Sequence, residues 1–134
     1  MTRTSINPGS MYNAVQFGIS HAVESDGGRL LHLSGQVAWD SNGELVGPGD
    51  LAAQAQQCFA NLAEVLASRG ATAANVVRLR TYVVDYSADK LEALGPAIGA
   101  FYGDVTPAAN TLLGVQALAM PDFLIEVEAT AVLD

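Results

Sequence analysis

The C-terminal segment 123–133 constrains the fold of this chain more than any other part of it, because its side chains alternate with a period of two. Successive side chains of a β-strand point to opposite faces of a sheet. Apolar residues at every second position therefore share one face, and Glu126 and Glu128 share the other. The segment predicts a strand whose apolar face is covered by another layer and whose second face carries two carboxylates.

A long amphipathic helix is predicted in the middle of the chain. Apolar residues at helical spacing run from Leu51 to Leu66. Asp50 precedes them as an N-cap, and Gly70 is suited to end the helix.

A second helix is expected after Ser87 or Asp89, and it contains Pro96. An interior proline lacks an amide hydrogen and clashes with the carbonyl group four residues earlier. We therefore expect a kink near Glu92 or two short helical segments.

Further strands are expected before and between these helices. They are predicted at 21–24, 29–33, 76–84 and 110–118, with another strand closed by the turn Ser41-Asn42-Gly43. The strands at 21–24 and 29–33 and the strand closed by Ser41-Asn42-Gly43 should form an antiparallel meander, which gives the order βββ-α-β-α-ββ. This order predicts a single α/β (α+β) domain over residues 1–134, with two helices on one face of a six-stranded mixed sheet.

The second face of that sheet is expected to need a cover, because its strands carry apolar residues on both sides. Leu30 alternates with Leu31, and Leu112 alternates with Leu113. An uncovered apolar face of this size exceeds what a soluble monomer normally exposes. We therefore predict a homo-oligomer closed through this face.

Charge and composition exclude several classes of function. The formal net charge of −8 repels phosphate backbones, so nucleic-acid binding is not expected. No apolar run approaches the roughly 20 residues that span a bilayer, and the first residues lack a signal-peptide pattern, so we expect no membrane partner and a cytoplasmic location. With one cysteine, Cys58, and two histidines, we expect neither a disulfide nor a metal centre within the chain, and no motif indicates a cofactor.

The two carboxylates on the uncovered face need partners, because an unpaired buried charge is costly. In one interpretation, Glu126 and Glu128 form cross-strand ion pairs with Arg78 and Arg80. In the other, one glutamate lies in an inter-subunit pocket with a raised pKa and acts as a general acid or base, or orients a water molecule. The sequence leaves both interpretations open.

Ser34 and Gly35 interrupt the strand that begins near Arg29. A Ser-Gly pair inside an apolar strand often marks a β-bulge, and it can also mark a place where a ligand approaches the backbone. A structural bulge is the simpler interpretation.

The chain resembles the Rid family (YjgF-like, endoribonuclease L-PSP-like) in the order and spacing of several segments. These are Ser20-His21-Ala22-Val23, Leu33-Ser34-Gly35-Gln36-Val37, Asn42-Gly43-Glu44, residues 54–66, Tyr82-Val83-Val84-Asp85, Gly114-Val115-Gln116-Ala117-Leu118 and Ile125-Glu126-Val127-Glu128-Ala129. The resemblance implies a chorismate-mutase-like fold and a homotrimer whose sheets form a central barrel, with small-molecule pockets between subunits. It also implies a link to the family's enamine/imine deaminases, which hydrolyse 2-imino acids to 2-keto acids and ammonia.

The resemblance assigns roles to individual residues. Glu126 stands where those deaminases have the glutamate that positions the attacking water, and Ser34-Gly35 stands where their strand forms a pocket wall. Asn110 occupies the position of the arginine that grips the substrate carboxylate.

Two further positions depart from the family pattern. Ile19 replaces a common aromatic residue, and Gly95 replaces an asparagine in the second helix.

The loss of the arginine changes the expected substrate. A guanidinium offers a carboxylate two charge-assisted hydrogen bonds, whereas Asn110 offers at most neutral donors of shorter reach. The sequence therefore predicts a poor 2-imino acid deaminase. It favours a pocket for a small neutral or weakly polar metabolite, with hydrolysis of an imine or enamine that lacks a carboxylate as one activity. The alternative is a non-catalytic ligand-binding or chaperone-like trimer. Ribonuclease activity is disfavoured by the acidic charge.

Overall fold

The strands and helices occur in the order βββ-α-β-α-ββ, as predicted, but the first three strands are not the predicted three: a strand at Thr2–Ile6 was not expected, and the one before Ser41 does not form. In the computed structural model, which describes residues 2–134, they are β1 (Thr2–Ile6), β2 (Ala22–Asp26), β3 (Arg29–Gln36), α1 (Leu51–Ala67), β4 (Val76–Val84), α2 (Leu91–Tyr102), β5 (Ala109–Val115) and β6 (Ile125–Leu133). Short 3₁₀-helices occur at η1 (Val15–Phe17), η2 (Ala73–Asn75) and η3 (Ala88–Lys90). The predicted α+β class is confirmed.

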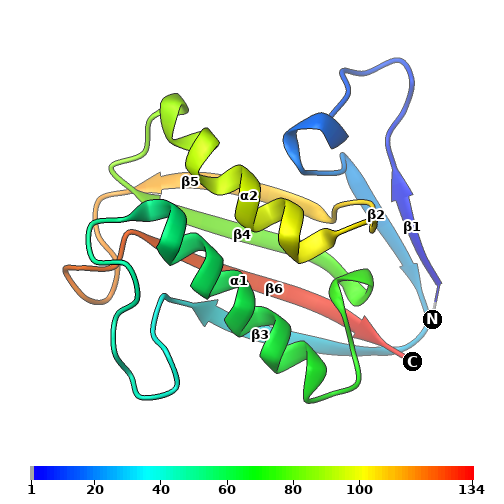
Figure 1. Cartoon of the computed structure of the whole chain (residues 1–134). Coiled ribbons are helices and arrows are strands. Elements are labelled where there is room, and N and C mark those ends of the chain that lie inside the picture. The colour runs from blue at the N-terminus through cyan, green and yellow to red at the C-terminus, as the bar shows by residue number, and fades with distance from the viewer. Residues whose placement is uncertain (1) are drawn as a thin grey trace.

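The six strands divide into two sheets, which corrects the prediction of one six-stranded sheet. The main sheet has the order β3-β6-β4-β5, with β4 and β5 parallel and the other pairs antiparallel. Strands β1 and β2 form a separate antiparallel pair. Figure 1 shows this pair beside the main sheet, while α1 and α2 lie together across one face of the main sheet.

The expected N-terminal meander is wrong for two local reasons. Gly27 and Gly28 both have positive φ angles and carry the chain from β2 into β3 without pairing these two strands. The segment that leads to Ser41 forms a turn instead of a strand, because the Asp40 carboxylate accepts hydrogen bonds from the amides of Asn42 and Glu44.

Helix α1 begins and ends at its predicted signals. The Asp50 side chain accepts a hydrogen bond from the amide of Ala53 at 3.1 Å. Beyond the last helical residue, Gly70 has a φ of 68°, and the amide of Ala71 donates to the carbonyl of Leu66.

Helix α2 continues through Pro96 as one element of 12 residues, preceded by the turn η3. Of the two expected outcomes, a kink near Glu92 or two short segments, the second is therefore not observed. The proline deprives only the Glu92 carbonyl of its helical partner, and Glu92 is exposed, so water can satisfy that group.

The alternation of β6 places its two faces as predicted. Ile125, Val127 and Ala131 are fully buried under the helices, whereas Glu126 and Glu128 are half-buried on the other face. We call this second face of the main sheet the open face, because no helix covers it in the described chain (Figure 1). The hydrophobic core thus lies between the sheet and the helices.

Candidate functional site

Glu126 projects from the open face at the start of β6, directly opposite Tyr82 of β4. Burial raises the pKa of the Glu126 carboxyl group, and the negative charge of Glu128 raises it further. Within residues 2–134, no side chain pairs with this carboxyl group by a hydrogen bond or an ion pair. Glu126 therefore holds its proton to a higher pH than an ordinary glutamate does.

Glu128, in contrast, has its charge neutralised within the chain. The guanidinium of Arg80 lies 3.7 Å from one of its oxygens, and the hydroxyl of Tyr82 donates a hydrogen bond to the other. The predicted cross-strand ion pair therefore forms at Glu128 and not at Glu126. The two carboxylates therefore have different environments: Glu128 is paired with Arg80 and Tyr82, whereas Glu126 has no such partner within residues 2–134.

Ser34 and Gly35 form the predicted bulge in β3. The register passes from Leu33 opposite Ala129 to Gln36 opposite Val127, so both Ser34 and Gly35 face a single position of β6. The bulge brings its glycine against the candidate catalytic group.

The contact between Gly35 and Glu126 is close. A Cβ atom at Gly35 would lie 2.3 Å from Oε2 of Glu126, so only glycine leaves room for the carboxylate in this position. Together we call Glu126, Ser34 and Gly35 the Glu126 cluster.

Replacing Gly35 with Ala is expected to displace the Glu126 carboxylate without unfolding the protein. The clashing atoms belong to the flexible end of a side chain, which can swing away. We expect turnover or ligand affinity that depends on Glu126 to fall by roughly 10- to 100-fold, with a change of unfolding free energy within about 1 kcal/mol. Gly9→Ala is the matched control, because a Cβ atom there meets nothing within 4 Å. Equal activity of the two variants would contradict this role for Gly35.

Asn110 faces the opposite side of the sheet from Glu126. It lies beside Leu79 in the β4–β5 register, on the side that the helices cover, and its Oδ1 atom accepts a hydrogen bond from the buried hydroxyl of Thr81 at 3.2 Å. Ile19 lies near the start of the same strand, because the amide of the next residue, Ser20, donates to the carbonyl of Ala108. We call Asn110 and Ile19 the Asn110 cluster.

The predicted site residues thus form two clusters that one chain does not bring together. The sheet separates the Glu126 cluster from the Asn110 cluster. The arginines of β4 do not replace the missing guanidinium: Arg80 is paired with Glu128, and Arg78, beside Ala109, lies on the open face and donates to the Thr111 hydroxyl.

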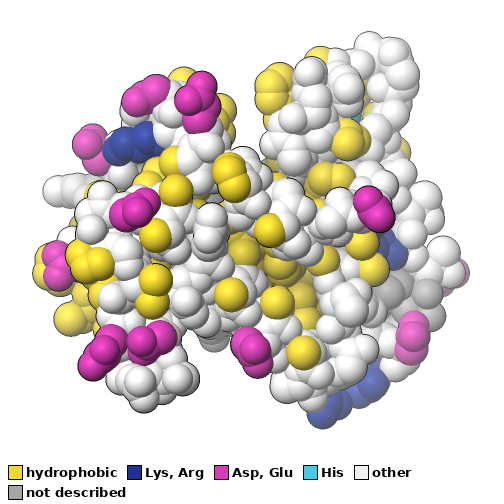
Figure 2. Space-filling view, viewed as in Figure 1, with side chains coloured by type: hydrophobic (Ala, Val, Ile, Leu, Met, Phe, Trp, Pro, Cys, Tyr) yellow, Lys and Arg dark blue, Asp and Glu magenta, His cyan; other side chains and the backbone are white. Residues whose placement is uncertain are grey.

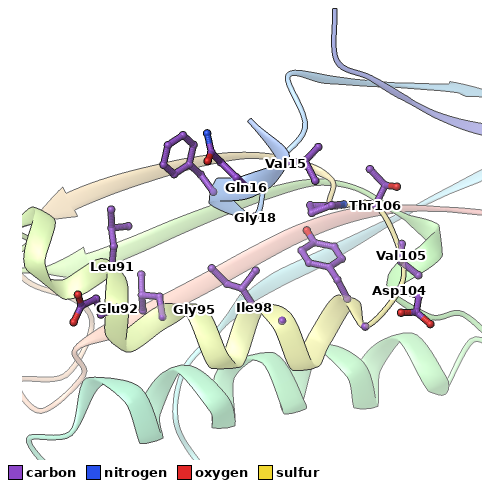
Figure 3. A pocket seen from close by; sticks show the side chains of 16 residues that line it. Val15, Gln16, Gly18, Leu91, Glu92, Gly95, Ile98, Asp104, Val105 and Thr106 are labelled. Atoms are coloured by element: carbon purple, nitrogen blue, oxygen red, sulfur yellow. The ribbon is translucent and has the colours of Figure 1, made fainter. Parts of the chain in front are cut away.

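Two cavities lie close to these clusters. The first, of about 640 Å³, lies between η1 and α2, and its lining includes Gly18 and Gly95 (Figure 3). The second, of about 710 Å³, is lined by Gly35, Trp39 and Asn61 among others. Neither cavity is lined by Glu126 or Asn110.

The wall that η1 contributes to the first cavity was missed from the sequence. The sequence feature that could have indicated this wall is Phe17, an aromatic residue outside any strand or helix pattern. In the structure its side chain is exposed.

Over residues 2–134, no group of three or more histidine, cysteine, aspartate and glutamate side chains is placed to hold a metal ion. In the same residues, none of the helices combines the length and apolar character needed to cross a membrane.

Comparison with known proteins identifies the family. The family model described as endoribonuclease L-PSP matches residues 13–133, so the chain belongs to this family, which is also called the Rid or YjgF family. The predicted family is confirmed, and so is its chorismate-mutase-like fold.

Three relatives show the degree of sequence and structural similarity. A Rid family protein of unknown function from Yersinia pestis, YyfB, is 62% identical, with a TM-score of 0.95 over 99% of this chain and 100% of that chain. Protein DfrA of Myxococcus xanthus is 32% identical over 114 residues, which cover 84% of this chain and 83% of that protein. A 2-iminobutanoate/2-iminopropanoate deaminase of Rattus norvegicus is 40% identical over 67 residues, about half of each chain (49% and 47%).

Proposed function

We propose that this protein is a homotrimeric Rid protein that binds a small neutral or weakly polar metabolite between its subunits and hydrolyses an imine or enamine that lacks a carboxylate. The observation that carries the proposal is the division of the site. Because the Glu126 cluster and the Asn110 cluster lie on opposite sides of one sheet, a pocket that contains both requires two subunits.

The open face supports assembly of this kind. Leu30 is 64% exposed and Leu113 is 46% exposed on this part of the molecule. Apolar side chains of this size at the surface favour association, because contact with a second copy removes them from water. Closure through the open face would bring Glu126 into the interface.

The chemistry follows from the state of Glu126. Its raised pKa suits a group that takes a proton from an attacking water molecule and returns it to the leaving nitrogen. The water oxygen adds to the imine carbon, the carbon–nitrogen bond then breaks, and the products are a carbonyl compound and ammonia or an amine. Asn110 of the second subunit would donate a hydrogen bond to the substrate from the other side of the pocket.

A carboxylate substrate is disfavoured because, within residues 2–134, Asn110 has no lysine or arginine side chain as a partner. Asn110→Arg is therefore expected to raise the release of ammonia from freshly generated 2-iminobutanoate by about tenfold or more, since a guanidinium pairs with the carboxylate in a bidentate way. Asn110→Gln is the control, and circular dichroism checks that both variants fold. The proposal fails if the unmodified protein already hydrolyses 2-iminobutanoate at the rate of arginine-containing relatives.

A second candidate function is a non-catalytic ligand-binding or chaperone-like trimer. The contacts of Glu128 with Arg80 and Tyr82 favour it, because they show that the carboxylates of β6 also have a structural use. Sedimentation of the Glu126→Gln variant separates the two candidates. Loss of the trimer would favour the structural function, and an intact trimer without turnover would favour catalysis.

A further inference from the structure

Basic side chains are scarce in this chain, so the place of each one is informative. The sequence has six lysines and arginines against fourteen aspartates and glutamates. Figure 2 shows acidic side chains spread over the helix side of the molecule, with basic ones near its edges. Arg80 lies instead on the open face, where β4 places it directly beside Glu128 of β6. Its charge is therefore next to the strand that carries Glu126.

The Glu128 carboxylate is held by two partners from β4. The guanidinium of Arg80 lies 3.7 Å from its Oε2 atom, and the hydroxyl of Tyr82 donates a hydrogen bond to its Oε1 atom. Tyr82 lies opposite Glu126 in the strand register, so it reaches Glu128 along the diagonal of the sheet face. Both oxygens of Glu128 are thus engaged, and the positions of its charge and of the guanidinium are linked.

Glu126 and Glu128 are close enough for the charge of one to act on the other. They are two residues apart on one strand and share a face, which puts their Cα atoms about 6.5 Å apart. Burial raises the pKa of Glu126, and the charge of Glu128 raises it further. A group that changes the net charge around Glu128 therefore also changes how tightly Glu126 holds its proton.

The other groups around Glu126 are uncharged near neutral pH or lie farther away. Cys58 of α1 is buried behind the sheet, and burial raises the pKa of its thiol to about 12. The pKa of the Tyr82 hydroxyl is also raised, because this hydroxyl donates a hydrogen bond to a carboxylate. On β3, the Ser-Gly bulge does not titrate, and His32 lies farther along the strand, opposite Thr130. Within residues 2–134, the charges next to Glu126 are therefore those of the carboxylate–guanidinium pair on the same face.

We propose that Arg80 is a positioning residue of the Glu126 site and acts through Glu128. The guanidinium neutralises part of the Glu128 charge, and it thereby lets Glu126 release its proton at a lower pH than it otherwise would, without touching Glu126. Tyr82 holds the second oxygen of Glu128 and keeps the carboxylate in place. This inference rests on the proposed function, because a general base must release and regain a proton at the working pH.

Nuclear magnetic resonance can follow the proton on Glu126 without a substrate. The full-length protein is labelled with ¹³C at its glutamate carboxyl groups and titrated from about pH 4 to pH 9, a range that includes ordinary and raised carboxyl pKa values. The signal that is missing from the Glu126→Gln variant belongs to Glu126. Arg80→Gln is expected to move the midpoint of this signal to higher pH by about 0.5 unit or more, because the Glu128 charge is no longer balanced.

Three further variants separate this role from a structural one. Arg80→Lys keeps the positive charge and should restore most of the original midpoint. Glu128→Gln removes the like charge and should move the midpoint to lower pH. Arg78→Gln is the matched control, because Arg78 is a cation of the same strand that lies beside Thr130 and contacts Thr111, so the midpoint should stay within about 0.2 unit of the original. Circular dichroism and sedimentation check that the variants keep the fold and assembly.

An unchanged midpoint in the Arg80→Gln variant would overturn the inference, and so would an equal shift in the Arg78→Gln variant. If Arg80→Gln moves the midpoint and Glu128→Gln does not, Arg80 does not act through Glu128. Failure of the proposed function gives a different result: the midpoints move as expected, but no imine is hydrolysed. Where an imine is hydrolysed, the acid limb of the pH profile of kcat/KM should move with the midpoint.

Discussion

Replacing Glu126 with Gln is expected to lower any hydrolytic turnover by about 10²- to 10⁴-fold, the usual contribution of a general acid or base. The amide keeps the shape of the side chain but cannot take or give a proton. The measurement is steady-state release of ammonia or carbonyl product from a series of imines without carboxylates. The fold should persist, because no hydrogen bond or ion pair joins Glu126 to the rest of residues 2–134.

The same variant has an expected dependence of stability on pH. The folded protein binds the Glu126 proton more tightly than the unfolded chain does, because burial and the charge of Glu128 raise its pKa. The free energy that this tighter proton binding adds to the folded state is fully present at low pH. It is lost as the pH rises through the folded-state pKa of Glu126. The Gln variant does not ionise, so it should be at least as stable as the unmodified protein at neutral pH, and that relative advantage should disappear in acid.

Urea unfolding from about pH 4 to pH 8 measures this difference, over a range that brackets an ordinary and a raised carboxyl pKa. Glu128→Gln is the matched control on the same strand. It removes a partner of both Arg80 and Tyr82, so its ion pair and its charged hydrogen bond are lost. A Glu126→Gln variant that unfolds like a core mutant, or one that keeps full turnover, would contradict the assigned role.

Replacing Gln54 with Leu is expected to destabilise the fold by about 3 kcal/mol or more. Gln54 is fully buried in α1, where its amide nitrogen donates to the carbonyls of Gly47 and Asp122 and its oxygen accepts from the amide of Leu124. Leucine fills a similar volume but leaves three backbone groups unpaired, and each costs about 1–3 kcal/mol when buried.

This substitution also tests how β6 is positioned. Leu124 lies two residues before Glu126, so Gln54 fixes the point at which the strand enters the sheet. Urea denaturation gives the loss of unfolding free energy. Gln56→Leu, an exposed position on the same helix, should change it by no more than about 0.5 kcal/mol. Equal losses in the two variants would show that the Gln54 hydrogen bonds contribute little.

Elements with strong local signals could be predicted from the sequence closely. Helix α1 begins after the Asp50 cap, and β4 spans the alternating residues 76–84. In both cases the pattern that specifies the element lies within the element or next to it.

Elements that depend on distant contacts could not be predicted. The segment Thr2–Ile6 lacks an apolar alternation, and the structure shows that Arg3 ties it to the carbonyls of Val76 and Thr106, at 2.7 and 2.9 Å. Contacts across 73 and 103 residues of sequence leave no local pattern.

Part of the candidate site could also be predicted, because that part depends on local patterns. The period of β6 placed Glu126 on the face away from the core, and the Ser-Gly pair indicated the bulge at Gly35. The face of Asn110, however, depends on which residue of β4 lies beside it, and this register is set by parallel pairing that a single strand does not encode.

The central place of β6 has a consequence for how the protein forms during synthesis. This strand is the last described in the sequence, yet it lies between β3 and β4. Because chains are made from the N-terminus, β3 and β4 emerge from the ribosome without the strand that joins them. The main sheet cannot close until Ile125–Leu133 has been released, so until then the nascent chain exposes unpaired strand edges, which are prone to aggregation.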